Sequence, residues 1–369
     1  MSGIIQALLA SLSAIKNYEL YSWGRNDLGS VGDNTIINKS SPVQIGSLTN
    51  WENIFAGRSH ILAVKSDGTA WAWGRNVQSG TALGCLGDGT ASNRSSPVQI
   101  GSLTNWAQMS GGNQHSLAVK TDGTLWSWGR QQYGQLGIGY LVARSSPVQV
   151  GSGWAKTSCG NYHSLAIKTN GTLWAWGQAF AGALGTGDSV NKSSPVQVGA
   201  LTNWSTVAGG NNFSGAVKTD GTMWTWGFNY QGQLGQNNRV YRSSPVQVGA
   251  LTTWSDISMR RSFSLAKKSD GTIWSWGRNQ NGNLGINATN NRSSPVQIGA
   301  LTNWNIVAAG STFGGSIKTD GTFWAWGSPS DGYIPTNGGY DKSSPVQIGA
   351  LTTWSNLSMS VYGGVATTS

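Results

Sequence analysis

The chain has 369 residues, of which 53 are glycine and 20 are tryptophan, and only 10% are charged. This composition excludes a disordered chain and predicts a folded protein with many tight turns and an aromatic-rich core. The formal net charge of +10 allows a nucleic acid or an acidic protein as partner, although it partly reflects a shortage of acidic residues, of which there are 14. The two cysteines, Cys85 and Cys159, form no metal-binding or disulfide motif.

The first 17 residues contain an apolar stretch that is too short to cross a bilayer and that lacks the basic start of a secretory signal. Read as a helix, the stretch places its large apolar residues on one stripe: Ile4, Ile5, Leu8, Leu9, Leu12 and Ile15. We predict a short helical docking segment over residues 1–17, which attaches the protein to a larger assembly or to a second copy of itself. The alternatives are a helix that packs on its own protein and a weak membrane or export signal.

From residue 18 onward, one repeat of about 50 residues fills the rest of the chain. The string Ser-Ser-Pro-Val-Gln occurs seven times, and an aromatic-x-Trp-Gly string also occurs seven times. A regular period of this length is typical of solenoids and propellers.

The repeat that runs from Trp106 to Val150 shows the expected elements. An apolar stretch begins at Trp106 and leads into the alternating segment 115–120, which reads as a strand. An Asp-Gly pair at 122–123 follows, which suits a type I′ hairpin turn, and then a partner strand in which Trp126 and Trp128 point to the same side. A Gly-rich loop leads to a last short strand at Val148. Each repeat therefore predicts about four short antiparallel strands.

A single four-stranded sheet cannot bury both of its faces, so neighbouring repeats must stack. The chain starts with an unpaired strand at 19–24 and stops where the other repeats reach their Asp-Gly turn. We therefore predict an all-β fold, a seven-bladed β-propeller over residues 18–369. Its four-stranded antiparallel blades are closed by the N-terminal strand, which completes the C-terminal blade.

The order Gly-x-x-His-Ser, Asp-Gly, Trp-x-Trp-Gly and Gly-Gln-Leu-Gly, clearest between Gly112 and Gly137, resembles the regulator of chromosome condensation repeat. That family forms seven-bladed propellers. Its founding member is a chromatin-bound exchange factor for a small nuclear GTPase, acting through one propeller face and a protruding β-hairpin. The longest excess in a repeat, five residues around 77–81, is too short for a comparable hairpin, and no basic nuclear-targeting run is present. We therefore do not expect the exchange function, which is kept as one alternative.

The histidines offer no metal site, because His60, His115 and His163 occupy one position that other repeats fill with Phe or Gly. Every Ser, Asp and Gly that recurs does so as turn chemistry, so no catalytic triad, carboxylate pair or phosphate loop can be proposed. We expect no enzyme activity, no cofactor and no metal.

A basic residue precedes every Ser-Ser-Pro and predicts a ring on one rim of the propeller: Lys39, Arg94, Arg144, Lys192, Arg242, Arg292 and Lys342. A second basic set follows the inner strand: Lys65, Lys120, Lys168, Lys218, Lys267 and Lys318. A ring of like charges attracts anions. The alternatives are solvated charge and pairing within the protein.

The loops after Trp-Gly vary most between repeats and carry aromatics of the kind that anchor interfaces: Tyr133, Tyr140, Phe180, Phe228, Tyr230, Tyr241, Tyr333 and Tyr340. We therefore expect a non-enzymatic structural propeller that contacts a protein or glycan through this loop rim. The similar repeats and the apolar leader favour a virion or cell-surface component over a nuclear one. The alternative is a regulatory module that binds nucleic acid or an acidic protein through the basic ring.

Overall fold

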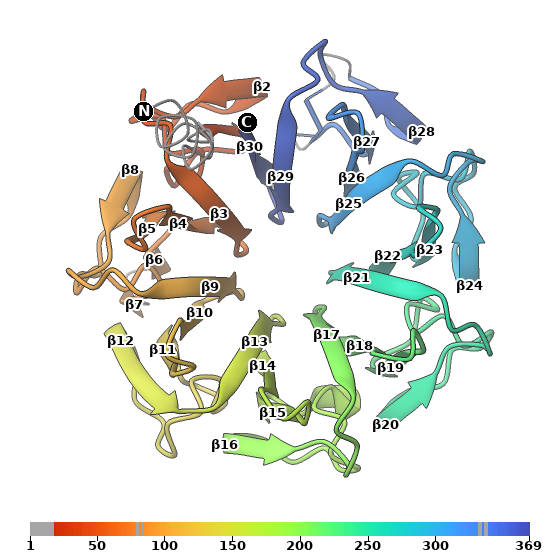
Figure 1. Ribbon diagram of the computed structural model, residues 1–369, viewed down its shortest axis with the longest axis horizontal. Coiled ribbons are helices and arrows are strands. Elements are labelled where there is room, and N and C mark those ends of the chain that lie inside the picture. Colours follow the sequence, from red (N-terminus) through yellow and green to blue (C-terminus); the bar gives the residue numbers. More distant parts are fainter. Residues whose placement is uncertain (1–17, 79–80, 83, 331–333, 336–338) are drawn as a thin grey trace, which may run out of the picture.

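The structure, a computed structural model, describes residues 18–78, 81–82, 84–330, 334–335 and 339–369. Seven four-stranded sheets surround a central channel like blades, as Figure 1 shows. This confirms the seven-bladed β-propeller. The predicted helical docking segment at residues 1–17 lies outside the described residues, so the proposal of a docking function is untouched by the structure.

The strands fall into four classes according to their distance from the channel (Figure 1). The innermost strands are β3 (Trp51–Ala56), β9 (Trp106–Gly111), β13 (Trp154–Cys159), β17 (Trp204–Gly209), β21 (Trp254–Arg260), β25 (Trp304–Ala309) and β29 (Trp354–Met359). The second strands are β4 (His60–Lys65), β10 (His115–Lys120), β14 (His163–Lys168), β18 (Phe213–Lys218), β22 (Phe263–Lys268), β26 (Phe313–Lys318) and β30 (Gly363–Thr368). The third strands are β5 (Ala70–Gly74), β11 (Leu125–Gly129), β15 (Leu173–Gly177), β19 (Met223–Gly227), β23 (Ile273–Gly277), β27 (Phe323–Gly327) and β1 (Glu19–Gly24). The outer strands are β8 (Arg94–Gln99), β12 (Arg144–Gly151), β16 (Lys192–Gln197), β20 (Arg242–Gln247), β24 (Arg292–Gln297), β28 (Lys342–Gln347) and β2 (Lys39–Gln44).

We number the blades from 1 to 7 by their innermost strands, from β3 to β29. Blade 7 combines both ends of the chain, in the order β2-β1-β30-β29. Six residues of β1 pair with six of β30, from Glu19 opposite Thr368 to Gly24 opposite Gly363. The prediction that the N-terminal strand closes the ring is therefore confirmed, and the N-terminal part supplies two strands of the closing blade.

The hydrophobic core lies between neighbouring blades. Between blades 3 and 4, for example, Leu165 and Leu173 share a buried cluster with Val207 and Trp226. Within blade 2, Trp106 makes edge-on ring contacts with both Trp126 and Trp128, at centroid distances of 6.2 Å in each case. The two tryptophans of the Trp-x-Trp string therefore face the same side, as the alternation of strand side chains predicts.

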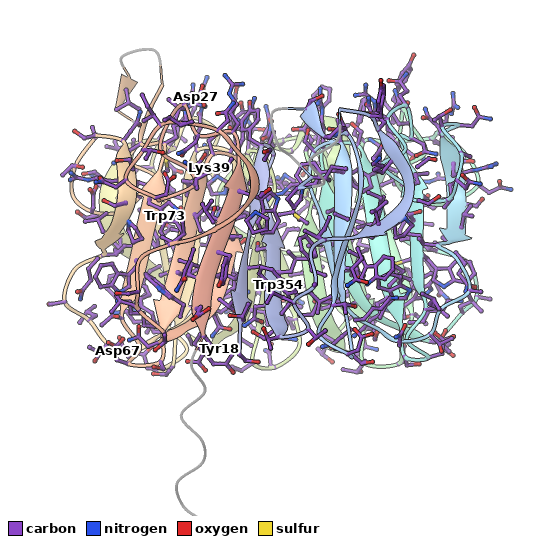
Figure 2. The ribbon with its side chains drawn as sticks, turned by 90° about the horizontal axis from the view of Figure 1, so that it is seen from above. Tyr18, Asp27, Lys39, Asp67, Trp73 and Trp354 are labelled. Carbon is purple, nitrogen blue, oxygen red and sulfur yellow. The ribbon has the colours of Figure 1, made fainter. Side chains whose placement is uncertain are left out.

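The ring has two faces that differ in their loops, as Figure 2 shows. We call the face with the Asp-Gly turns, near Asp67 in Figure 2, the hairpin face. The opposite face, near Asp27, carries the loops between third and outer strands, and we call it the long-loop face. A small extra hairpin, β6 (Val77–Gln78) with β7 (Thr81–Ala82), extends from the long-loop face. The other short element is a 3₁₀ turn at Phe180–Gly182.

The Asp-Gly turns are not of the predicted type I′. In blade 2, the Lys120 N–H donates to the Thr124 carbonyl at 3.0 Å, and the Gly123 N–H donates to the Lys120 carbonyl at 2.9 Å. Gly123 has a φ of +76°, whereas Asp122 has no positive φ. A type I′ turn needs positive φ at both central residues, so this is a three-residue loop with only its last residue in the left-handed region.

Candidate functional site

The three histidines hold blades together. The Nε2 atoms of His60, His115 and His163 lie 2.9 to 3.1 Å from the hydroxyl of a serine in the next blade. For His115 this serine is Ser164, which donates its own proton to the Gln135 carbonyl at 2.7 Å. Nε2 therefore donates, and the rings are neutral. Burial lowers the pKa to about 3 for His60 and His115 and to about 4 for His163.

The second basic set is also part of the packing. In blade 2, the Lys120 ammonium lies 4.0 Å from the Trp126 ring centroid and 4.7 Å from that of Trp106. The same cation–π arrangement recurs in six blades, at Lys65, Lys120, Lys168, Lys218, Lys268 and Lys318. The sequence assignment of Lys267 to this set is wrong, because Lys268 is the residue that stacks on the two tryptophans of blade 5.

The predicted basic ring lies where the outer strands begin, on the long-loop face, as Lys39 in Figure 2 illustrates. Among the described residues, three of its seven members form salt bridges with an aspartate of their own loop. These pairs are Lys39–Asp33 at 2.9 Å, Arg94–Asp88 at 2.8 Å and Lys192–Asp188 at 2.8 Å. Arg144 and Arg242 contact uncharged partners, Tyr140 and Gln236. The ring is thus partly neutralised inside the protein, and anion binding by it stays a prediction.

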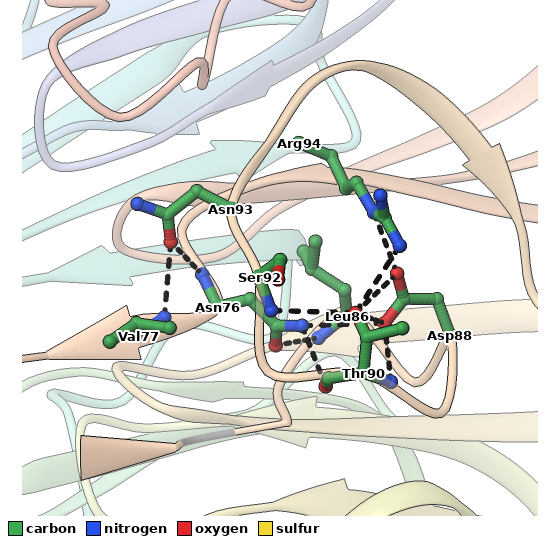
Figure 3. A network of polar contacts seen from close by, with 8 residues as sticks. All are labelled: Asn76, Val77, Leu86, Asp88, Thr90, Ser92, Asn93 and Arg94. Atoms are coloured by element: carbon green, nitrogen blue, oxygen red, sulfur yellow. Dashed lines mark hydrogen bonds and ion pairs between the residues drawn. The ribbon is translucent and has the colours of Figure 1, made fainter. Parts of the chain in front are cut away.

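The long loops contain internal networks of polar contacts. In blade 1, the Asn76 side chain accepts from the Leu86 N–H at 3.1 Å and donates to the Thr90 carbonyl at 2.9 Å (Figure 3). Asp88 accepts from both Thr90 and Arg94 in the same network. Burial raises the pKa of Asp88, but the hydrogen bonds from Thr90 and Arg94 outweigh it, so the pKa lies below its ordinary value. Side chains on these loops therefore share a hydrogen-bonded framework.

Four of the predicted rim aromatics gather into one patch across blades 3 and 4. Phe228 is half-buried at its centre, with ring centroids of Phe180 at 6.1 Å, Tyr230 at 6.4 Å and Tyr241 at 4.8 Å. Phe180 is 52% exposed and Tyr230 is 62% exposed. We call these four residues the aromatic patch. An exposed cluster of this kind is typical of protein contact surfaces.

The remaining rim aromatics are dispersed. Tyr133 packs edge-on against Tyr162 at 5.4 Å, and Tyr140 lies under the Arg144 guanidinium at 5.2 Å. Tyr340 is 82% exposed. Tyr333 lies outside the described residues. The structure therefore joins part of the predicted set into one surface and leaves the other residues apart.

The channel opens on the long-loop face through a cavity of about 590 Å³. Four arginines line it, namely Arg58, Arg260, Arg261 and Arg278. None of the described lining residues is acidic, and none of the four arginines is in a salt bridge within the described part of the chain. We call this cavity the channel mouth.

The described residues contain no group of three or more His, Cys, Asp or Glu side chains that could hold a metal ion. In the same residues, no helix is long and apolar enough to cross a membrane. Both cysteines are buried free thiols, and burial raises their pKa to about 12.

A comparison with models of known protein families shows which family the chain belongs to. The family model described as the regulator of chromosome condensation (RCC1) repeat matches residues 19–64, 67–119, 122–167, 170–217, 220–266 and 270–316. These matches cover more than half of the chain. The chain belongs to the RCC1 repeat family.

The curated relatives of this RCC1-repeat chain match it over about a third of its length. It is 33% identical to the ultraviolet-B receptor UVR8 of Arabidopsis thaliana over 36% of this chain and 30% of the relative. It is 34% identical to the RCC2 homolog of Xenopus laevis over 36% of this chain and 26% of the relative. The matched part therefore spans less than a third of either relative.

Solved structures show the same fold at low identity. Prp20p of Saccharomyces cerevisiae, described with its binding to Gsp1p and histones, aligns with a TM-score of 0.83 and 18% identity over 96% of this chain and 92% of that one. Human WBSCR16 aligns with a TM-score of 0.84 and 17% identity over 95% of this chain and 98% of that one. The expectation of a virion or cell-surface structural component is wrong, because the matching family is described as the regulator of chromosome condensation repeat and the similar structure of Prp20p is described with its binding to Gsp1p and histones.

The sequence analysis missed the channel mouth of this RCC1-repeat propeller. A usable signal was present, because Arg260 occupies a position that is glycine in five other blades: Gly57, Gly112, Gly160, Gly210 and Gly310. The basic ring was chosen as a candidate site because it recurs in all seven repeats, whereas Arg260 occurs in only one. A departure from the repeat at this position marks the central arginine instead; the other departure there is Ser360 in blade 7.

Proposed function

We propose that this RCC1-repeat propeller is a non-enzymatic regulator that binds a protein partner through its long-loop face. Family membership and the regulatory character of its relatives support this class of function. The net charge of +10 and the arginines of the channel mouth favour an acidic partner surface, since opposite charges steer association.

The aromatic patch carries the proposal. Phe228 is flanked by three exposed rings from two blades, on loops that contain their own side-chain to backbone hydrogen bonds. Rigid aromatic side chains give large contact area at low entropic cost and often dominate binding free energy. A partner that covers this patch would bury it fully.

The experiment is a binding measurement with the full chain immobilised and purified acidic proteins, small GTPases first, in solution. We expect saturable binding that Phe228→Ala weakens by about 2 kcal/mol, roughly thirtyfold. Tyr340→Ala, an exposed aromatic outside the patch, serves as the matched control and should leave the affinity unchanged. Equal losses in both variants, or binding insensitive to Phe228→Ala, would overturn the assignment of the patch.

Nucleotide exchange on a small GTPase is the second candidate function, and the β6–β7 hairpin favours it. The sequence excess at 77–81 is short, and it contributes to an antiparallel pair of two-residue strands on the long-loop face (Figure 2). The family resemblance associates exchange with a propeller face and a protruding hairpin.

A nucleotide-release assay tests this candidate. Small GTPases loaded with a fluorescent GDP analogue are mixed with the full chain and excess GDP. We expect faster release from one of them, and we expect deletion of residues 77–81 to abolish the acceleration while the protein still binds through the aromatic patch. Unchanged release in every case, or full activity of the deletion variant, would exclude a role of the hairpin in exchange.

A further inference from the structure

Arg260 breaks the repeat at a position that is glycine in five other blades. A Cβ atom at Gly57 would lie 2.3 Å from the His60 ring, and one at Gly310 would lie 2.4 Å from the Phe313 ring. Blade 5 escapes this clash because its loop is rebuilt: β21 runs one residue further, and Arg260 pairs with Phe263. The next residue, Arg261, has a φ of +36°, a conformation that costs free energy for a residue with a side chain.

The Arg260 side chain crosses the channel to the opposite blades. Its Nη2 atom donates to the Ala56 carbonyl of β3 in blade 1 and to the Met359 carbonyl of β29 in blade 7, the latter at 3.1 Å. Arg260 lines both the channel mouth and the smaller cavity below it, so its guanidinium forms a floor between them. Burial lowers the pKa of this guanidinium to about 10. The acid in the lower cavity is Asp256, which is not among the residues of the mouth.

The walls of the channel mouth add three more guanidinium groups. Arg58 donates to the Tyr362 hydroxyl at 3.1 Å, Arg261 donates to the Ser311 hydroxyl at 3.1 Å, and Arg278 donates to the Gln280 side chain. All these partners are uncharged. Arg58 Nε and Asn113 Nδ2 are buried donors without a hydrogen-bond partner in the described part of the chain. The mouth thus presents uncompensated positive charge.

We propose that the channel mouth binds a compact, multiply phosphorylated small molecule. A volume of about 590 Å³ lies within the range of roughly 300–1,000 Å³ that small-ligand sites occupy. Guanidinium groups bind phosphate oxygens through paired, charge-assisted hydrogen bonds, and several converging arginines favour several phosphates on one ligand. The arginine floor closes the lower end, so the ligand enters from the long-loop face.

This inference goes beyond the proposed protein partner, because it assigns a separate ligand to a separate set of residues. The ligand would neutralise the desolvated Arg260 and fill the centre of the face that carries the aromatic patch. The two proposals can therefore fail independently, since Phe228→Ala tests one surface and Arg260→Gly tests the other.

The experiment is calorimetric titration of the full chain with inositol hexakisphosphate as probe, at about 150 mM salt, where surface charge is largely screened. We expect saturable binding of one molecule per chain. Arg260→Gly, which restores the residue of five other blades, should weaken binding at least roughly tenfold. Arg278→Gln should also weaken binding and guards against a folding defect in the first variant. Arg292 is an exposed member of the basic ring, and the variant Arg292→Gln should bind the probe within about twofold of the natural chain.

Three results would overturn the proposal. One is the absence of saturable binding by the natural chain. Another is an equal loss in Arg292→Gln, which would show that net charge and not the mouth attracts the probe. The third is displacement of the probe by a short DNA duplex at lower concentration, which would assign the site to nucleic acid. Retained binding of the partner protein by Arg260→Gly would leave the proposed function intact.

Discussion

The two faces of the propeller come from the same repeat but differ in how much they change from blade to blade. On the hairpin face, Thr124 donates to Asp122 at 2.6 Å and Trp126 donates to Thr124 at 2.9 Å, and equivalent bonds recur around the ring. On the long-loop face, neighbouring loops differ in length and sequence. Repetition therefore marks the residues that hold the fold, and variation marks the surface that is free to acquire a partner.

The comparison predicts that a repeated residue matters for stability where its side chain is buried between blades. Trp176 is fully buried, and its Nε1 donates to the Gln135 carbonyl of the preceding blade at 2.9 Å. Its ring leaves so little space that a Cβ atom at Gly137 would lie 2.7 Å from Nε1. We expect Trp176→Ala to lower the free energy of unfolding by about 3–5 kcal/mol, through the cavity and the lost hydrogen bond.

Urea denaturation followed by tryptophan fluorescence measures this effect. Tyr340→Ala is the control on the variable face, where an 82% exposed side chain should contribute less than about 0.5 kcal/mol. If the two variants lost similar stability, the distinction between a structural and a variable surface would not hold.

The second largest effect is a loss of stability in acid, which comes from the three buried histidines. Buried His60, His115 and His163 have pKa values of about 3 to 4, whereas an unfolded histidine titrates near 6.5. Between these values the unfolded chain binds protons that the native chain does not, so stability is complete above pH 6.5 and falls as the pH is lowered. The loss reaches about 2 kcal/mol per histidine at pH 5.

His115→Phe tests the assignment, because Phe213, Phe263 and Phe313 fill the same position in other blades. Ser164 keeps its hydrogen bond to the Gln135 carbonyl in this variant. We expect the variant to fold and to lose about 2 kcal/mol less than the natural chain between pH 7 and pH 5, as measured by urea denaturation at both pH values. An unchanged pH dependence would mean that His115 is protonated in the native state.

The difference between repeated and variable residues also explains which features could be predicted from the sequence. Strand alternation, the seven-fold period and the split repeat at the chain ends specify the propeller, since each follows from local pattern. The sequence analysis assigned Lys267 instead of Lys268 because adjacent lysines look equivalent in a sequence. The alternation of strand side chains places only Lys268 over Trp254 and Trp274. The channel mouth could not be predicted from one repeat, since Arg260 contacts blades 1 and 7, whose distance from it depends on ring closure.

These adjacent lysines give a sharper test on the hairpin face. The Lys268 ammonium lies 3.8 Å from the Trp274 ring centroid and 5.1 Å from that of Trp254. Lys267 instead donates to the Asn305 carbonyl at an exposed site. We expect Lys268→Met to lower stability by about 1 kcal/mol and Lys267→Met by less than about 0.5 kcal/mol, as measured by thermal denaturation. A larger loss in Lys267→Met than in Lys268→Met would mean that Lys267, and not Lys268, is the equivalent of the stacked lysines in the other blades.

The smallest expected effect concerns the basic ring on the long-loop face. Arg94 bonds to Asp88, whose side chain is 2% exposed, whereas Arg292 is exposed and has no such aspartate partner among the described residues. We expect Arg94→Met to cost about 0.2–1 kcal/mol at low salt and less at 1 M salt, and Arg292→Met to cost nothing measurable. Thermal denaturation at both salt concentrations measures the difference. A loss in Arg94→Met that does not depend on salt would indicate that the aliphatic stem of Arg94 packs the loop and that the ion pair with Asp88 contributes little. The Asp88 pair would then give no reason to treat Arg94 as a weaker anion-binding charge than Arg292.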